Sequence, residues 1–446
     1  MNENKSVIRN PWSWVPTLYF AEGMPYIVVM TVSAIMYKRL GLSNTDIALY
    51  TSWLYLPWVI KPFWSPLVDL LKTRRWWIVA MQLLIGAGLA GVAFTLPTSF
   101  FIKGTLAFFW LMAFSSATHD IAVDGFYMMG LNENQQAFFI GIRTTFYRIA
   151  MIIGQGLLVI LAGFLENSPL SVKLSAVAGS GPIPVAWSVT FVILAFIFLV
   201  FAFYHKFMLP KPSEDIEVVK VELKSIVSGF KETIVAFFNK KDIWMILAYL
   251  LLFRLGKAQL LKMSTPFLLD SHASGGLALS TSEVGFIYGT LGLIALIMGG
   301  LLGGWMASIY GLKRLLWTFV VFMNLPGAVY IYLAYTQTAS LWIIGSAVVI
   351  EQFGYGFGFT AFSLYMLSIS AGRHKTSNYA FSTGIMALGM MLPGMASGWL
   401  EDLWGYHSFF IWVMICTIPG LILTKFIHIE SDFGIREKQA VIQNKD

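Results

Sequence analysis

The chain has 446 residues, of which 57% are hydrophobic and 12% are charged, and its mean hydropathy is +0.71. A soluble protein carries about twice that share of charge, so this composition predicts an integral membrane protein. The net charge of +7 does not indicate nucleic-acid binding, because the cations lie in short loops between apolar stretches. The single cysteine, Cys416, excludes an internal disulfide framework.

Twelve apolar stretches follow one another, and each is long enough for a membrane-spanning helix, which takes about 20 residues. The apolar runs are continuous rather than alternating, so the sequence predicts an all-α protein and not a barrel. The first stretch lacks the short apolar core and small-residue cleavage site of a signal peptide. The predicted spans are 12–36, 46–70, 76–97, 103–130, 137–165, 184–208, 242–269, 281–309, 314–335, 340–370, 377–400 and 405–427.

The distribution of Lys and Arg orients these spans. If both termini are cytoplasmic, most of the 30 Lys and Arg residues fall in cytoplasmic loops and termini, as the positive-inside rule requires. The opposite side then carries only Lys38, Arg39, Lys103 and Lys173. We therefore predict a multi-pass membrane protein whose two termini are cytoplasmic.

The longest polar stretch, 211–241, divides the spans into two sets of six. Its apolar residues recur at intervals of three and four, which indicates an amphipathic helix on the cytoplasmic membrane surface. We predict an N-terminal bundle over 1–208, this linker over 209–241 and a C-terminal bundle over 242–446. A linker that binds a regulatory partner is the alternative to a plain connection.

The two sets of spans repeat each other weakly. Three pairs of similar segments recur in the same order, at offsets between 237 and 241 residues, which argues for a duplicated chain with two related halves. Asp46 and Glu283 each follow a serine by three residues, so we expect them to cap helices. The paired segments are 25–26 with 266–267, 43–46 with 280–283, and 61–75 with 304–314.

Several ionisable residues lie inside the predicted spans, where such groups are costly unless paired or hydrated. At about 1.5 Å rise per residue, Asp120 and Arg148 reach similar depths, and so do Asp124 and Arg143, so we expect these two ion pairs. A carboxylate that changes its partner during transport can take up and release a proton. Static ion pairs that hold the helices in register are the alternative. The candidate proton-coupling residues are Asp120, Asp124, Glu22 and Glu351.

Proline interrupts the first and seventh spans at corresponding places, 22–25 and 264–266. Paired interruptions in two related halves point to a substrate site near the bilayer midplane. Cations on the seventh span favour an anionic ligand, and nearby tyrosines could stack on sugar or ring faces. The candidate substrate-binding residues are Tyr26, Lys61, Tyr147, Arg148, Arg254 and Lys257.

The loop after the second span resembles the loop motif of the major facilitator superfamily, small-x-x-x-Asp-x-x-Gly-x-basic-basic. The resemblance implies twelve transmembrane helices in two pseudo-symmetric six-helix bundles, with a gate at the cytoplasmic side. Asp69 would act at that gate together with Arg74, Arg75 and Arg143, whereas its counterpart Ser308 would contribute little. The motif positions are Ser65, Asp69, Lys72, Arg74 and Arg75, with serine and lysine in place of two glycines.

Two further motifs resemble those of the AmpG-type muropeptide permeases. Residues 56–69 read Leu-Pro-Trp-Val-Ile-Lys-Pro-Phe-Trp-Ser-Pro-Leu-Val-Asp, and residues 117–125 read Ala-Thr-His-Asp-Ile-Ala-Val-Asp-Gly. Residues 147–148 and 378–380 also fit this family, and the two motifs are similar to those of the related acetyl-coenzyme A transporters. The resemblance implies a proton-coupled importer of the bacterial inner membrane. Its substrate would be GlcNAc–anhydro-MurNAc, with or without peptide, or a similar anionic sugar derivative.

The sequence leaves three alternatives to an importer of anhydromuropeptides. They are a carrier of acetyl-coenzyme A or another acyl or nucleotide thioester, a membrane acyltransferase, and a receptor. An acyltransferase needs a nucleophile and a base, and His119 has no catalytic partner evident in the sequence. A receptor would carry a soluble signalling domain. We expect a monomeric transporter that binds protons and a small molecule, lies in membrane lipid, and uses no cofactor, metal or nucleic acid.

Overall fold

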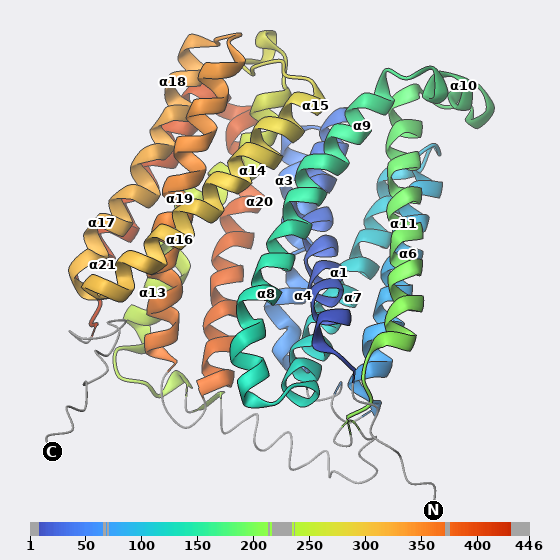
Figure 1. Cartoon of the computed structure of the whole chain (residues 1–446). Coiled ribbons are helices and arrows are strands. Elements are labelled where there is room, and N and C mark those ends of the chain that lie inside the picture. The colour runs from blue at the N-terminus through green and yellow to red at the C-terminus, as the bar shows by residue number, and fades with distance from the viewer. Residues whose placement is uncertain are drawn as a thin grey trace, which may run out of the picture.

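The computed structural model describes residues 9–65, 68, 71–212, 215, 234–235, 237–370 and 375–429, and its elements are helices. Within this part of the chain, nine helices are long and apolar enough to cross a membrane. Figure 1 shows them side by side, running between two ends of the molecule. We name the end where α9 meets α10 the upper end, and the end where α7 meets α8 the lower end.

The helices of the first half are, in chain order, η1 (Pro11–Ser13), α1 (Val15–Ile27), η2 (Val28–Val32), α2 (Ser33–Arg39), α3 (Asn44–Trp53), α4 (Leu56–Ile60), η3 (Lys61–Phe63), α6 (Arg74–Thr95), α7 (Phe101–Gly130), α8 (Glu133–Ile152), η4 (Ile153–Leu157), α9 (Leu158–Glu166), α10 (Pro169–Ala178) and α11 (Pro182–Met208). Ser43 caps α3 by accepting a hydrogen bond from the backbone of Asp46 at 3.0 Å. This is the serine cap predicted from the sequence.

The helices of the second half are α13 (Ile243–Leu252), α14 (Leu255–Leu269), η5 (His272–Ser274), α15 (Thr281–Val284), η6 (Gly285–Gly292), α16 (Leu293–Tyr310), α17 (Leu312–Asn324), η7 (Leu325–Ala328), α18 (Val329–Thr336), α19 (Leu341–Ile369), α20 (Lys375–Ile415) and α21 (Ile418–Thr424). Ser280 and Glu283 form the complete reciprocal capping box at the start of α15.

The difference between nine long apolar helices and twelve predicted spans has three local causes. The second span is divided into the short segments α3, α4 and η3, because Pro57 and Pro62 cannot continue a helix. The tenth span is α19, which is 29 residues long but is made less apolar by Glu351 and Gln352. The last two spans form one run over Asn378–Thr424, with a change of direction at Gly405, whose φ of +68° favours glycine.

The predicted breaks at the prolines are wrong. Residues 22–25 lie within the continuous helix α1, and Pro25 is followed by the wide π-type turns of η2. Residues 264–266 lie within α14, and the seventh span is interrupted earlier, at Phe253 and Arg254, between α13 and α14. Pro266 lies only three residues before the end of its helix, and neighbouring helices can compensate a missing backbone donor inside a membrane protein.

Glycines at positions 299 and 303 let α16 and α19 pack closely. A Cβ atom on Gly299 would lie 2.1 Å from the backbone oxygen of Phe353, and one on Gly303 would lie 2.8 Å from that of Phe357. Both distances are too short for any side chain. These glycines therefore fix the separation of the two helices.

Helix α11 shows why so many apolar side chains are exposed. Phe191 and Phe198 are fully buried against the bundle, whereas Phe196 and Phe203 on the other face are 66% and 67% exposed. An apolar face of this size would be unstable in water, but it suits contact with lipid tails. The exposed apolar belt therefore supports a transmembrane position for the bundle.

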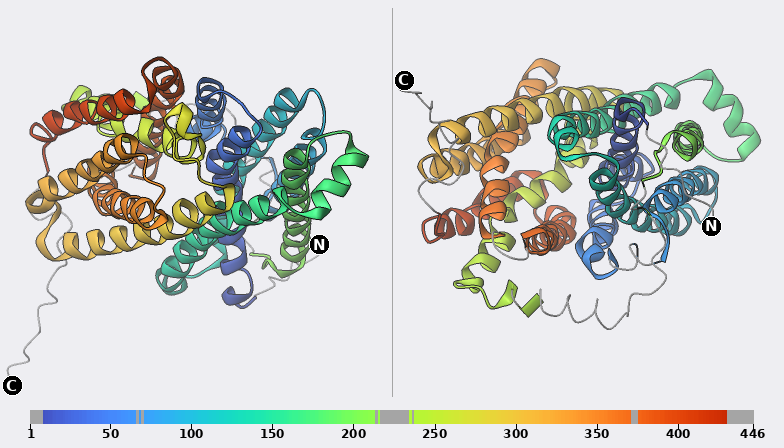
Figure 2. Two further views of the ribbon diagram at one scale, coloured as in Figure 1. Left: turned by 90° about the horizontal axis from the view of Figure 1, so that it is seen from above. Right: turned by 60° about the horizontal axis from the view of Figure 1, so that its bottom comes forward.

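The two halves lie side by side when the molecule is seen from above (Figure 2). One cluster of buried residues contains both Tyr37 and Leu42 from the first half and Phe267 and Tyr406 from the second. Two other clusters are each confined to one half: one surrounds Trp14, Tyr19 and Phe126, and the other surrounds Tyr249, Phe319 and Phe362. The halves are therefore packed together at one end and separate at the other.

The boundaries predicted at residues 208 and 242 remain predictions. Most of the linker over 209–241 lies outside the described residues, and so does its predicted amphipathic helix.

Candidate substrate-binding site

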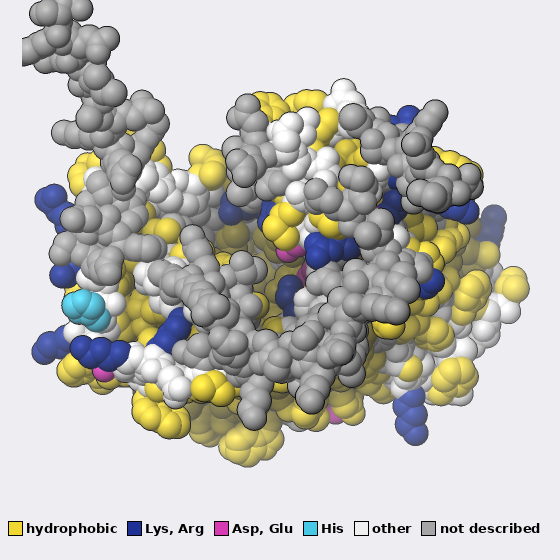
Figure 3. Space-filling view, turned by 90° about the horizontal axis from the view of Figure 1, so that it is seen from below, with side chains coloured by type: hydrophobic (Ala, Val, Ile, Leu, Met, Phe, Trp, Pro, Cys, Tyr) yellow, Lys and Arg dark blue, Asp and Glu magenta, His cyan; other side chains and the backbone are white. Residues whose placement is uncertain are grey.

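A cavity of about 390 Å³ lies between the two halves. In the first half, its wall comes from α1, η2, α2, α4, η3, α8 and η4. In the second half, it comes from α14, η6, α16, α19 and α20. The space-filling view from below shows the lower end hollowed between the halves, with basic and acidic side chains inside (Figure 3). The polar and aromatic lining residues are Tyr26, Thr31, Tyr55, Trp58, Lys61, Tyr147, Gln155, Arg254, Lys262, Thr265, Tyr288, Gln352, Tyr355 and Thr383.

Among the described residues that line this cavity, three are cations and none is acidic. Lys61 lies on the first half, whereas Arg254 and Lys262 lie on the second. Arg254 donates to the hydroxyl of Tyr355, and its guanidinium lies over the ring of Phe359 at 4.8 Å. The cavity wall therefore carries a net positive charge, which attracts an anionic ligand.

Aromatic rings surround these cations. Tyr26 packs edge-to-face on Trp58, with ring centroids 5.4 Å apart. Tyr55 lies under Lys262, whose Nζ is 5.4 Å from the ring centroid. Such a wall combines ring faces with hydroxyl and indole groups, so it can pack against a sugar ring and also hydrogen-bond to its hydroxyls.

Asp120 lies directly behind the cavity wall and contacts two of its residues. Its Oδ2 accepts a hydrogen bond from Trp58 Nε1 at 3.1 Å and lies 3.7 Å from Lys61 Nζ. The predicted pair of Asp120 with Arg148 is therefore wrong. Lys61 reaches Asp120 from the bent second span, whose geometry the rise of a regular helix could not predict. Among the described residues, no carboxylate forms an ion pair with Arg148, whose guanidinium lies near Gly300 in the other half.

Asp124 forms the ion pair predicted with Arg143, at 3.4 Å. The Nη1 of Arg143 also donates to the hydroxyl of Tyr19 at 3.1 Å, and the guanidinium lies over the rings of Tyr19 and Tyr127. These contacts stay within the first half. The ion pair is about half exposed on the Asp124 side.

Two further acids proposed for proton coupling are buried. Glu351 on α19 is 1% exposed and forms an ion pair with Lys257 of α14, which is 3% exposed. Neither residue lines the cavity, so Lys257 is not placed to contact a ligand there. Glu22 on α1 is 8% exposed, and its Oε2 accepts no hydrogen bond from the described residues.

Arg74 and Arg75, which were predicted to act at the gate, lie at the lower end, where α6 begins. Asp69 lies outside the described residues, so its predicted contacts remain a prediction. The backbone amides of Arg74 and Arg75 donate to the carboxylate of Asp215 at 2.7 and 3.1 Å. The Arg74 side chain lies against Gly125, where a Cβ atom would overlap its guanidinium. This explains the glycine that follows Asp124.

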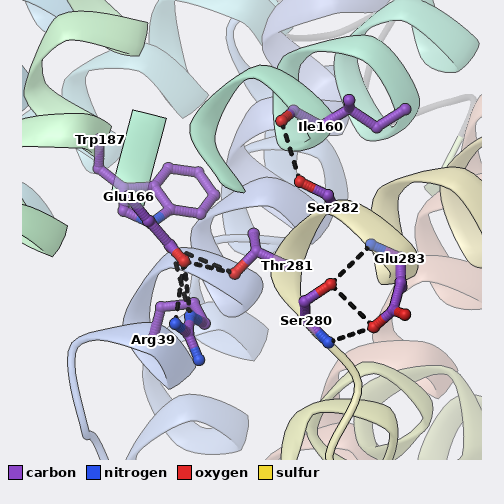
Figure 4. Close-up of polar contacts among 8 residues, drawn as sticks. All are labelled: Arg39, Ile160, Glu166, Trp187, Ser280, Thr281, Ser282 and Glu283. Atoms are coloured by element: carbon purple, nitrogen blue, oxygen red, sulfur yellow. Dashed lines mark hydrogen bonds and ion pairs between the residues drawn. The ribbon is translucent and has the colours of Figure 1, made fainter. Parts of the chain in front are cut away.

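Polar contacts hold the halves together at the upper end (Figure 4). Glu166 on α9 accepts from Arg39 and Trp187 in its own half, and from the Thr281 hydroxyl of the other half at 2.9 Å. Nearby, Asp270 forms an ion pair with Lys38 at 2.6 Å. These contacts close the cavity on that side.

A second contact group at the upper end also joins the halves. The Asn44 amide donates to Glu401 and to the hydroxyl of Tyr406, and the Tyr406 hydroxyl donates to Asp270 at 2.6 Å. The Thr45 hydroxyl donates to Asp402. Together with the contacts of Lys38 and Arg39, these hydrogen bonds form the closed upper end of the molecule.

Four of the six residues predicted to bind substrate do line the cavity: Tyr26, Lys61, Tyr147 and Arg254. Sequence reasoning did not select Lys262, Tyr288 or Gln352, which line it as well. The sequence does point to Lys262 as a functional candidate, because a lysine within an apolar span is costly to bury. His119, beside Asp120, turns away from the cavity and receives a hydrogen bond from Gln82, which in turn contacts His205.

Comparisons with known proteins agree with this architecture. The anhydromuropeptide permease of Escherichia coli is 27% identical over 418 residues, which cover 91% of this chain and 77% of that protein. A protein named putative transporter AmpG 4 in Rickettsia conorii is 26% identical over 431 residues, covering 92% and 95%.

Solved structures share the fold. A bacterial homolog of the human lysosomal transporter Spinster, in an inward-facing and unoccupied conformation, superposes with a TM-score of 0.66 at 17% identity, covering 93% of this chain and 94% of that one. A D-xylose–proton symporter superposes with a TM-score of 0.67 at 14% identity, covering 95% and 98%.

The family comparison confirms the prediction of a transporter fold with two pseudo-symmetric bundles of six helices. The Major Facilitator Superfamily matches residues 17–394, which is most of the chain. The protein is therefore a multi-pass membrane transporter, and it belongs to the Major Facilitator Superfamily.

Proposed function

We propose that this protein imports anhydromuropeptides across the bacterial inner membrane and that the proton gradient drives this import. Anhydromuropeptides are GlcNAc–anhydro-MurNAc with or without a peptide. The observation that supports the proposal most strongly is the cavity wall, whose described residues include three cations and several aromatic rings but no acid. The similarity to the anhydromuropeptide permease supports the same substrate class. A similar anionic sugar derivative fits the same chemistry.

Asp120 is the proton-coupling residue in this proposal. Its carboxylate now neutralises Lys61, which lines the cavity, so an anionic substrate must compete with it for the same ammonium group. A proton on Asp120 removes that competition and leaves Lys61 free for the substrate. Binding of a proton and binding of an anion would then favour each other, which is the coupling that a symporter needs. Asp124, Glu22 and Glu351 remain further candidates.

Alternating access completes the cycle. The upper end is closed by contacts across the halves, and the cavity lies beneath them. We infer from the distribution of Lys and Arg that the lower end is cytoplasmic, so this conformation faces inward. A fluorescent protein fused to the C-terminus should then fluoresce in cells, and a periplasmic reporter that is active at this position would overturn the orientation.

Uptake into proteoliposomes tests the proposal. The purified protein should accumulate radiolabelled GlcNAc–anhydro-MurNAc when a proton gradient is imposed, and collapsing the gradient should abolish accumulation. Asp120→Asn should lose at least about tenfold of the gradient-driven uptake and should still bind substrate, because the neutral amide mimics the protonated acid. Asp242→Asn is the matched control, since Asp242 is exposed and lies away from the cavity.

Two results would contradict the proposal. Uptake that persists without a proton gradient would show that transport is not coupled to protons. An Asp120→Asn protein that transports normally would show that Asp120 is not the coupling residue. Accumulation of acetyl-coenzyme A in place of the sugar would favour the thioester carrier, whose substrate is also anionic.

A further inference from the structure

Lys262 is a buried cation in the cavity wall. It is 8% exposed, and its Nζ donates to the hydroxyl of Thr51 in the other half at 2.8 Å. Among the described residues, no carboxylate forms an ion pair with it, whereas Lys61, Arg143 and Lys257 each have an acidic partner. A buried ammonium without a counter-ion is costly, so its retention suggests that a ligand supplies the negative charge.

Arg254 is the other cation of the cavity that has no acidic partner among the described residues. It is 5% exposed, and it contacts the tyrosine hydroxyl and the aromatic rings described above. Arg254 immediately precedes α14, and Lys262 lies within that helix, eight residues further on. At about 1.5 Å per residue, the two backbone positions are about 12 Å apart along the helix axis. The cavity wall therefore contains two cations that have no acidic partner among the described residues, and they lie at different positions along the axis of α14.

We propose that Lys262 is a second anion-binding residue, which together with Arg254 makes the site select substrates that carry two separated anionic groups. The two head groups contact different partners, Tyr355 and Thr51, so an elongated ligand with two carboxylates can neutralise both cations. This inference rests on the proposed function and deepens it. Peptide-free GlcNAc–anhydro-MurNAc has one carboxylate, on its lactyl group. In the peptide-bearing form this group is an amide, and the stem peptide carries several carboxylates at separate positions. The site would then prefer the peptide-bearing form.

The test compares the affinity of two ligands for the same protein preparations. Purified protein in detergent is titrated with peptide-free GlcNAc–anhydro-MurNAc and with the same disaccharide bearing a tetrapeptide. Wild type should bind the tetrapeptide form more tightly. Lys262→Gln should weaken binding of the tetrapeptide form by about tenfold or more, and should change binding of the peptide-free form by less than about twofold. Lys262→Arg should preserve most of the preference.

Two controls separate ligand binding from a structural role. Thr51→Val removes the hydroxyl that Lys262 contacts but leaves the ammonium in the cavity, so the preference should persist. Lys173→Gln removes a positive charge from an exposed site outside the cavity. A ratio of dissociation constants does not depend on how much of each preparation is folded.

The outcomes are distinct. Equal weakening of both ligands by Lys262→Gln, or the same loss of preference in Thr51→Val, would overturn the inference and leave the proposed function intact. Wild-type protein that binds neither ligand would overturn the proposed function and this inference with it.

Discussion

Ionisable residues inside the bundle fall into two groups, according to whether an opposite charge lies beside them. Lys61, Asp124 and Glu351 have partners at hydrogen-bonding or ion-pair distance, whereas Arg254 and Lys262 have none among the described acids. A paired group is satisfied without a ligand, so it can serve either stability or proton coupling. An unpaired group depends on water or a ligand for its stabilisation, which makes it the better candidate for substrate binding.

The pair of Lys257 and Glu351 provides a test of a structural role. Both side chains are almost completely buried, so Glu351→Gln should leave an uncompensated ammonium and lower the free energy of unfolding by about 3–5 kcal/mol. The double variant Lys257→Met, Glu351→Leu should recover most of that loss, because it buries no charge. Thermal unfolding in detergent measures both effects. A stable Glu351→Gln protein that binds substrate but lacks gradient-driven uptake would instead make Glu351 a proton site.

Close helix contacts across the two halves depend on glycine. A Cβ atom on Gly398 of α20 would lie 1.9 Å from the backbone oxygen of Asn44 at the start of α3. This contact joins the halves at the upper end, where Asn44 also contacts Tyr406. Helix α20 must therefore approach α3 without a side chain whenever that end is closed.

Gly398→Val should therefore prevent closure of the upper end while leaving each half folded. We expect uptake to fall at least about tenfold, with a smaller effect on thermal stability than on transport, because the clash arises between the halves. Gly345→Val is the control, since no atom lies within 4 Å of a Cβ atom at that position. Uptake by Gly398→Val that equals the control would show that α3 and α20 need not approach this closely.

The whole molecule is closed at its upper end by a small number of polar contacts. Asp270 accepts hydrogen bonds from Asn44 and Tyr406 and forms an ion pair with Lys38, so one carboxylate joins both halves. Alternating access requires these contacts to break and form again in each cycle. Their strength therefore affects how the protein divides between its two conformations.

Replacement of Asp270 by Asn should shift the population toward a state that is open at the upper end. Spin labels at Ser99→Cys and Leu403→Cys, both at exposed positions, in a Cys416→Ser background, report the separation of the halves there. The distance distribution should gain a longer component in Asp270→Asn. Asp46→Asn is the control, because the Asp46 side chain contacts Ser43 within its own half. An unchanged distribution in Asp270→Asn would mean that the apolar contacts alone hold this end closed.

The sequence by itself determined the membrane class, the all-helical fold, and most of the span positions, because long apolar runs have few other stable solutions in a bilayer. It also identified Tyr26, Lys61, Tyr147 and Arg254 as candidates for the site, since polar groups within apolar spans are costly and therefore conspicuous. Composition and spacing carry that information, and neither depends on how the helices pack.

The tertiary structure decided which of these groups meet. Asp120 contacts Lys61 rather than Arg148, because the second span is bent by its prolines and brings Lys61 toward the fourth. Lys257 faces Glu351 instead of the cavity, whereas Lys262, five residues along the same helix, lines it. The breaks expected at Pro25 and Pro266 are absent, because both prolines lie within continuous helices. A helix fixes the spacing of its own side chains, but only the arrangement of its neighbours fixes what each side chain contacts.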